Sequence, residues 1–216
     1  MHRLNSTLAR PLAACPDGRS AAGPHAAEGP SARLFIAVPL PDTLKEILAR
    51  RCERLRETVP FAKWVYRDDY HITVQYLGAT PLQRVDAIRA KLAEAAAAQG
   101  PFGLKLSSLG AFGKSSSPQI LWTGVQGELA PLEALYRRVV EAMIPFGYVP
   151  EERPYKPHIT LARKYRGTEP FDARRAEASL PPLEESEWQA AELILYESRG
   201  GREPMYQPLA RMPIGG

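Results

Sequence analysis

The spacing of apolar residues along the chain predicts three amphipathic helices. Apolar positions recur three and four residues apart, the period that places them on one face of a helix. The segments with this period are 41–59, 81–100 and 128–147. In the third segment one stripe holds Leu132, Leu135, Val139 and Met143. Asp42 or Thr43 is the expected N-cap of the first helix, because short polar side chains cap helix starts.

Between these helices, short runs rich in β-branched and aromatic residues predict strands. The runs are 33–40, 61–66, 70–77, 102–109, 117–125, 156–163, 190–198 and 205–212. Residues 171–188 are charged and lack a clear period, so we expect them to be irregular. Strands and helices are interspersed, and a similar order recurs in each half of the chain. The sequence therefore predicts an α+β fold of two similar lobes that face each other.

Composition sets limits on the domain organisation and the partners. Residues 1–31 are rich in Ala, Gly, Pro and Ser, which predicts a disordered tail ahead of a single bilobal domain at residues 32–212. No apolar run approaches the roughly 20 residues that cross a bilayer. Two cysteines, Cys15 and Cys52, are too few for a disulfide framework, so we expect a cytoplasmic protein. The net charge of +4 suits a phosphate-bearing partner, whereas a long nucleic-acid footprint calls for denser basic clusters.

One tripeptide occurs twice: His-Ile-Thr stands at His71–Thr73 and again at His158–Thr160. A single histidine in a strand is usually structural, but two copies of the same tripeptide are poorly explained by coincidence. Because side chains alternate across a strand, each copy places its imidazole and hydroxyl on one face, about 6–7 Å apart, above an apolar backing. Two imidazoles, one neutral and one charged, can act as general base and general acid. The pair therefore points to acid–base opening of a cyclic phosphodiester, with hydroxyls and a cation holding the phosphate.

The residues around these two copies resemble a known family. The blocks that carry the resemblance are "RLFIAVPLP", "KWVYRDDYHITVQYLG", "ILWTGV", "ERPYKPHITLARKY" and "LILYES". Together they resemble the RNA 2',3'-cyclic phosphodiesterases, the LigT-like (ThpR) branch of the 2H phosphoesterase superfamily, formerly called 2'-5' RNA ligases. The resemblance covers about residues 33–210 and includes two H-x-[TS]-x tetrads, His71–Val74 and His158–Leu161. It implies two pseudo-symmetric lobes of antiparallel sheet plus helices around a central cleft.

The resemblance also implies an activity and a set of roles. The family hydrolyses a terminal 2',3'-cyclic phosphate, on RNA ends or nucleotides, to a 2'-phosphate, without metal or cofactor. Carried over to this sequence, His71 is the expected proton donor to the leaving 3'-oxygen, and His158 the expected proton acceptor that activates water. Thr73 and Thr160 are expected to hold phosphate oxygens, and Arg163 matches an arginine that contacts phosphate. We expect a monomer with no obligate protein partner and no membrane association.

Two of the candidate residues leave a structural question open. Arg163 stands five positions after His158, so a regular strand would point it away from the histidine. For Arg163 to reach the cleft, the strand must end or bulge near Ala162. Phe35 has two equal interpretations: it lines the cleft and stacks a base, or it is an ordinary core residue.

Two other kinds of site are not supported by the sequence. The stretch "SLGAFGKSSS" has Ser108 where a phosphate-binding loop requires glycine, and a strand rather than a helix follows, so residues 112–119 are expected to form a flexible turn between the lobes. No carboxylate or cysteine stands at ligand spacing from His71 or His158, so no metal is expected. Two alternative functions stay open: ATP-independent 2'-5' RNA ligation by the same residues, and a non-catalytic nucleotide- or RNA-binding module.

Overall fold

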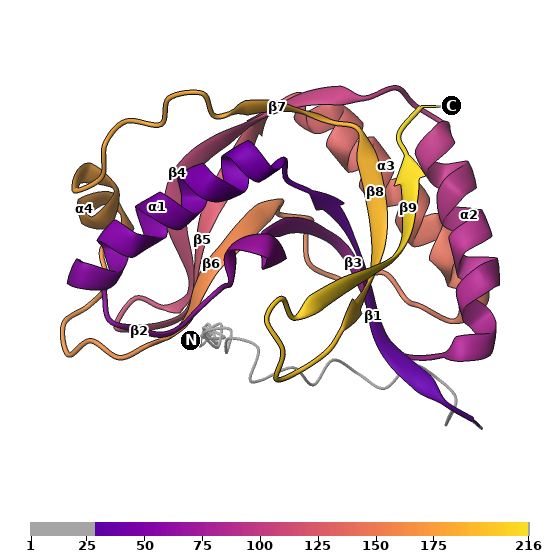
Figure 1. Ribbon diagram of the computed structural model, residues 1–216, viewed down its shortest axis with the longest axis horizontal. Coiled ribbons are helices and arrows are strands. Elements are labelled where there is room, and N and C mark those ends of the chain that lie inside the picture. Colours follow the sequence, from indigo (N-terminus) through magenta and orange to yellow (C-terminus); the bar gives the residue numbers. More distant parts are fainter. Residues whose placement is uncertain (1–28, 216) are drawn as a thin grey trace, which may run out of the picture.

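The computed structural model describes residues 29–215 of the chain, and its helices and strands are labelled in Figure 1. The strands are β1 (Ser31–Pro39), β2 (Phe61–Trp64), β3 (His71–Pro81), β4 (Phe102–Lys114), β5 (Ser117–Gly127), β6 (His158–Tyr165), β7 (Glu187–Ala190), β8 (Glu192–Ser198) and β9 (Tyr206–Pro213). The helices are α1 (Asp42–Thr58), α2 (Val85–Ala97), α3 (Leu129–Met143) and α4 (Ala173–Ala178). Short 3-10 turns cover Arg67–Asp69, Leu82–Arg84 and Ile144–Phe146.

All nine strands of the described residues belong to one antiparallel sheet. Its order is β7-β4-β5-β6-β3-β1-β8-β9, and β2 pairs with the C-terminal half of β6 off this path. The two middle strands, β3 and β6, are the two that carry His-Ile-Thr, and they are joined by the single pair Ile72–Ile159. The α+β prediction is confirmed, and the two predicted lobes are the two halves of one sheet that meet at these strands.

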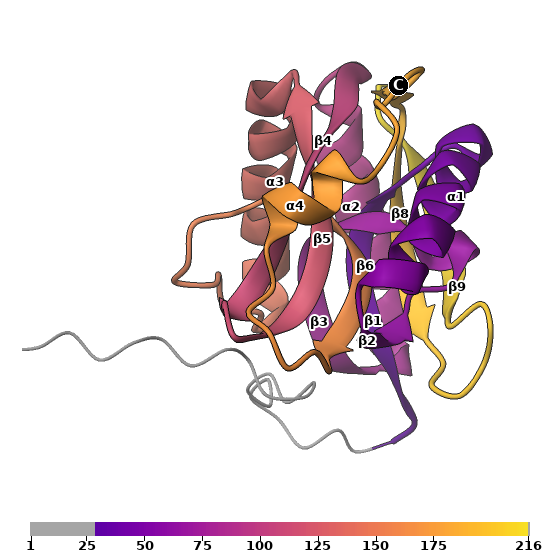
Figure 2. The ribbon, with the colours of Figure 1, turned by 90° about the vertical axis from the view of Figure 1, so that its left-hand side faces the viewer.

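The views from two directions show how the sheet is covered. In Figure 1 helices α2 and α3 lie beside each other at the right, and α1 and α4 lie at the left. Figure 2, turned by 90°, shows the strands between α3 on one side and α1 on the other. Among residues 29–215, no helix has the length and apolarity required to cross a membrane.

The predicted apolar positions form the core. The α3 stripe of Leu132, Leu135, Val139 and Met143 is fully buried. The residues that alternate with His and Thr in the two middle strands are also buried: Ile72, Val74, Ile159 and Leu161. Each such side chain contributes about 1.5–3 kcal/mol by leaving water. The catalytic candidates therefore stand on a rigid apolar backing, as the alternation predicts.

Two predictions about local structure were wrong: the N-cap of the first helix and the irregular character of residues 171–188. The N-cap of α1 is Pro41, and neither Asp42 nor Thr43 makes a capping bond. Asp42 instead lies in the first turn, where its charge interacts favourably with the helix dipole. Residues 171–188, expected to be irregular, contain α4 and the start of β7. Asp172 caps α4 by accepting hydrogen bonds from two backbone N–H groups. The helix has only 6 residues, which is too short for its apolar residues to show a helical period.

The turn expected between the lobes is a β-hairpin inside one half of the sheet. Strands β4 and β5 pair as far as Lys114 and Ser117. Gly110, in the stretch that resembles a phosphate-binding loop, lies in β4, where its lack of a side chain makes room for the ring of Trp122. Gly113 has a φ of +107°, which glycine adopts without strain, at an irregularity of the hairpin. Both glycines therefore serve a long hairpin.

The first strand begins slightly earlier in the chain than the sequence predicted. β1 begins at Ser31, which pairs with Pro81. Residues 1–28 of the predicted tail, including Cys15, lie outside the described residues. Cys52 is buried in α1.

Candidate active site

The register of the two middle strands brings the four predicted His and Thr residues together. Ile72 pairs with Ile159 in antiparallel register. Continued by one position in each direction, that register places one histidine at the level of the threonine of the other strand. The facing pairs are His71 with Thr160 and Thr73 with His158. Because faces alternate, all four side chains share the face opposite the two isoleucines.

The two imidazoles are held in the same way. Nδ1 of His71 lies 2.7 Å from the carbonyl oxygen of Asp69, and Nδ1 of His158 lies 2.7 Å from the carbonyl oxygen of Lys156. A carbonyl can only accept, so Nδ1 carries the proton in both rings. The neutral imidazoles therefore present an unprotonated Nε2. In His71 this atom lies 3.1 Å from Oγ1 of Thr73, which donates to it.

Both histidines are held neutral by their surroundings. Burial lowers the pKa of His71 to about 4, and the charges of Arg163 and His158 contribute in the same direction. Burial also lowers the pKa of His158, with further contributions from Arg163 and Lys156. Desolvation disfavours the imidazolium form at both sites. A bound anion would act in the opposite direction, because negative charge favours the imidazolium.

Arg163 reaches the cleft face through a bulge in β6. Along β5, Leu121 pairs with Ala162 and the next residue pairs with Thr160, so Leu161 is the extra residue. Leu161 and Ala162 are both buried, which reverses the phase of the strand, and Arg163 is exposed. Burial raises the pKa of the Tyr206 hydroxyl, and the nearby charge of Arg163 opposes this rise. The bulge lies next to Ala162, the place where the strand had to end or bulge if Arg163 was to reach the cleft.

The same irregularity occurs in β3 and produces a residue that the sequence analysis missed. Along β1, Ile36 pairs with Gln75 and the next residue pairs with Thr73, so Val74 is the extra residue. The phase then reverses, and Tyr76, five positions after His71, is 38 % exposed. Tyr76 is thus the counterpart of Arg163. Aligning the two tetrads position by position would have pointed to it.

Phe35 lies beside His71 but is buried. Its ring centroid is 4.8 Å from that of His71 and 5.2 Å from that of Tyr196, with which it stacks. Tyr206 packs edge-on against both Phe35 and His71. Phe35 is only 4 % exposed. Of the two interpretations, the geometry places Phe35 in a small buried cluster that forms one wall around His71.

Asp69 is a second residue that the sequence analysis did not select. Its carboxylate is buried and accepts hydrogen bonds from the backbone N–H groups of Met205 and Tyr206, both at 3.0 Å. Burial raises the pKa of this carboxyl group, and the two hydrogen bonds oppose the rise. The same residue holds His71 through its carbonyl. Asp69 therefore connects the turn before β3 with the start of β9.

Lys156 stands two positions before His158, as Asp69 stands two positions before His71, but its side chain is held by aromatic rings. Its ammonium lies 5.3 Å from the centroid of the Phe112 ring and 4.7 Å from that of the Trp122 ring, within cation–π range. The Phe112 ring also packs edge-on against His158, at 4.9 Å. A positive charge is thereby held beside the second imidazole.

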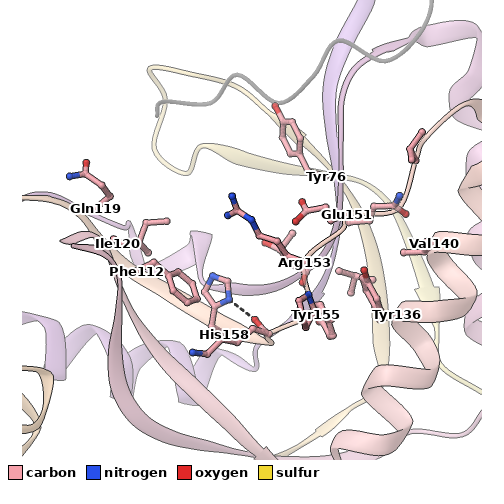
Figure 3. A pocket seen from close by; sticks show the side chains of 17 residues that line it. Tyr76, Phe112, Gln119, Ile120, Tyr136, Val140, Glu151, Arg153, Tyr155 and His158 are labelled. Carbon is pink, nitrogen blue, oxygen red and sulfur yellow. Dashed lines mark hydrogen bonds between the residues drawn. The ribbon is translucent and has the colours of Figure 1, made fainter. Parts of the chain in front are cut away.

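A cavity of about 520 Å³ opens beside these residues (Figure 3). Thr73 and His158 both line it, so it is continuous with the face that carries the tetrads. Its size is within the roughly 300–1,000 Å³ of small-molecule sites. Among residues 29–215, no three His, Cys, Asp or Glu side chains are grouped so that they could hold a metal ion.

Fold and site together define a class. A curved antiparallel sheet whose two middle strands present paired His-x-Thr groups is the arrangement of a 2H phosphoesterase. The profile of the 2'-5' RNA ligase superfamily matches residues 44–202, and the chain belongs to this family.

The relatives and solved structures agree with this membership. The chain is 38 % identical over 182 residues to an RNA 2',3'-cyclic phosphodiesterase of Geobacillus stearothermophilus, covering 84 % of this chain but only 57 % of that relative's length. It is 29 % identical to the RNA 2',3'-cyclic phosphodiesterase of Bacillus subtilis (strain 168), covering 83 % of this chain and 95 % of the relative.

Two solved structures resemble the fold. A Thermus thermophilus protein aligns with a TM-score of 0.66 at 26 % identity, covering 85 % of this chain and 98 % of that one. E. coli LigT without ligand aligns with a TM-score of 0.69 at 24 % identity, covering 86 % and 99 %.

Proposed function

We propose that this protein hydrolyses the 2',3'-cyclic phosphate at RNA ends to a 2'-phosphomonoester, without a metal ion. The observation that supports the proposal is the antiparallel pair Ile72–Ile159, which brings the two His-Ile-Thr segments side by side with their histidines and threonines on one face of the sheet. In both imidazoles Nδ1 is held by a backbone carbonyl, which leaves Nε2 for the substrate. The two curated relatives named above carry the name of this activity.

The phosphate would lie between the two imidazoles. Thr73 and Thr160 donate hydrogen bonds to its non-bridging oxygens, and Arg163 offsets the charge that develops on them. His158 Nε2 removes a proton from water as the water oxygen attacks phosphorus. The P–O3' bond breaks, and protonated His71 delivers its Nε2 proton to O3'. The product is a 2'-phosphomonoester, and proton exchange with solvent restores the starting charges.

This assignment requires the substrate to change the charge state of the site. With a pKa of about 4, His71 is neutral at pH 7 in the free protein and cannot donate a proton. The phosphodiester anion favours imidazolium and so supplies the condition under which His71 becomes the acid. Because kcat/KM reports the free enzyme, and both pKa values lie below the ordinary 6.5, we expect kcat/KM to be highest below pH 6.5.

The direct test is an assay on a 2',3'-cyclic-phosphate RNA end with the purified protein. We expect formation of a 2'-phosphate that EDTA does not suppress and that His71→Ala or His158→Ala abolishes. Activity that EDTA removes and a divalent ion restores would contradict metal independence. The absence of turnover in the wild-type protein would instead favour a non-catalytic RNA- or nucleotide-binding module.

Ligation is the alternative that uses the same residues. If the attacking group is a 5'-hydroxyl instead of water, the same proton transfers give a 2'-5' bond. Water at about 55 M outcompetes a second RNA unless that RNA is held in place. Adding a 5'-hydroxyl oligonucleotide to the assay measures the ratio of joined to hydrolysed product, and we expect the hydrolysed product to dominate.

A further inference from the structure

The two strands that carry the tetrads share very little of the sheet's hydrogen-bond ladder. Among the described residues, β3 and β6 pair only at Ile72–Ile159. The next position, where Thr73 stands at the level of His158, is not a pair of the ladder. The placement of the second tetrad relative to the first therefore depends on contacts outside this ladder.

A tyrosine hydroxyl supplies such a contact at the point where the ladder stops. The hydroxyl of Tyr155 donates a 3.2 Å hydrogen bond to the carbonyl oxygen of Thr73. Tyr155 stands three residues before His158, in the segment that leads into β6. A phenol side chain is longer than a ladder hydrogen bond, so it can connect backbones that lie further apart than the roughly 4.8 Å of paired strands. The bond joins the approach to the second tetrad with the backbone of the first.

Each end of this bond lies next to a group that holds an imidazole. At one end, Oγ1 of Thr73 lies 3.1 Å from Nε2 of His71. At the other end, the residue after Tyr155 is Lys156, whose carbonyl oxygen lies 2.7 Å from Nδ1 of His158. A single side-chain hydrogen bond thus connects the immediate supports of both histidines.

Two features make this connection stiff. Pro157 precedes His158, and its ring fixes its own φ and keeps Lys156 in an extended conformation. The rings of Tyr155 and Tyr136 stack with centroids 4.1 Å apart and an angle of 4° between their planes, and both pack against the core. Figure 3 shows the two rings together at the cavity wall. Burial raises the pKa of Tyr155, so its hydroxyl stays protonated and remains a donor.

We propose that Tyr155 is a positioning residue of the active site, whose hydroxyl sets the distance between the two His-Ile-Thr segments. This rests on the proposed function, in which both imidazoles act on one phosphate. Tyr155 acts through Thr73 and Lys156 and transfers no proton in the reaction. Because a displacement of about 1 Å between reacting groups can cost roughly 100-fold in rate, loss of the hydroxyl slows the chemical step.

The test is Tyr155→Phe, which removes the hydroxyl and keeps the ring in its stack, assayed on a 2',3'-cyclic mononucleotide. We expect kcat to fall about 10- to 100-fold, with KM within about twofold of the wild-type value. A wild-type kcat in this variant would overturn the proposal. A raised KM at unchanged kcat would overturn it as well, because it would assign the hydroxyl to substrate binding.

Tyr148→Phe is the matched control. The hydroxyls of Tyr148 and Thr80 lie 2.8 Å apart, so this variant also removes a tyrosine hydrogen bond to β3, but at the far end of the strand from the tetrad. We expect both variants to lower the denaturation midpoint to a similar small extent, and Tyr148→Phe to keep kcat within about twofold of the wild-type value. An equal loss of kcat in the two variants would indicate a generally loosened fold and would contradict a positioning role.

A measurement that needs no turnover separates this proposal from the proposed function. The ring C–H signals of His71 and His158 in NMR spectra report the surroundings of each imidazole. We expect these signals to shift in Tyr155→Phe and to keep their wild-type positions in Tyr148→Phe. Unchanged signals in Tyr155→Phe would overturn the positioning role. Shifted signals in a protein whose wild-type form does not hydrolyse the cyclic nucleotide would support the link between the two segments and contradict the proposed function alone.

Discussion

The surroundings of His71 and His158 share a geometry and differ in charge and space. Each Nδ1 meets the carbonyl of the residue two positions earlier at 2.7 Å, and each strand bulges directly after its threonine. Before His71, however, that earlier residue is a buried carboxylate anchored to β9, whereas before His158 it is a lysine anchored on two aromatic rings. Pseudo-symmetry thus supplies the shared placement, and the neighbours make the two imidazoles chemically unequal.

The largest expected effect tests this inequality directly. General acid–base catalysis contributes about 10²- to 10⁴-fold, so His71→Ala and His158→Ala should each lose at least that much activity. A substrate with sulfur in place of the 3'-oxygen has a leaving group that needs no proton. We expect it to restore turnover to His71→Ala and not to His158→Ala. The opposite pattern of rescue would reverse the roles of the two histidines.

The next largest effect is expected at Asp69, whose carboxylate anchors the turn before His71 to the start of β9. Asp69→Ala leaves the N–H groups of Met205 and Tyr206 without their acceptor, and we expect the free energy of unfolding to fall by about 2–4 kcal/mol. Activity should fall as well, because Tyr206 packs against His71 and lies near the charge of Arg163. Asp69→Asn keeps an accepting oxygen and is the matched control, with a smaller loss. Denaturant unfolding with parallel assays measures both, and wild-type stability in Asp69→Ala would contradict the anchor.

A smaller effect concerns the pH dependence of stability. The pKa of His71 falls from 6.5 when unfolded to about 4 when folded, so the unfolded chain binds the proton more tightly. Above pH 6.5 His71 is neutral in both states, and its titration does not reduce the free energy of unfolding. As the pH falls from 6.5 towards 4, the unfolded chain takes up the proton first, and the free energy of unfolding decreases. His71→Gln should remove about 2–3 kcal/mol of this loss between pH 7 and pH 4. His158→Gln should remove less, and unfolding curves at both pH values would show whether it does.

The smallest expected effect concerns the charge on the His158 side. Lys156 lowers the pKa of His158, so Lys156→Met should move the kcat/KM profile towards higher pH. Lys156→Arg keeps the positive charge over the rings and should leave the profile in place. A Lys156→Met profile that coincides with the wild type would show that this charge does not affect the second imidazole.

The sequence by itself determined the features that depend on local period. Alternation along a strand put each histidine and its threonine on one face over buried Ile72 and Ile159, and helical spacing gave the buried stripe of α3. The repeated tripeptide identified the four central candidates. Each of these features depends on residues a few positions apart, so the pattern of side chains is sufficient to predict it.

Only the tertiary structure decided how distant parts meet. The register at Ile72–Ile159 and the bulges that turn Tyr76 and Arg163 to the cleft depend on hydrogen bonding to strands far away in the chain. Asp69 bonds the backbone of Met205 across 136 positions. The cavity exists because β3 and β6 separate after a single pair. Backbone pairing between strands leaves little trace in the order of side chains, and for that physical reason the sequence could name the reacting groups but not their surroundings.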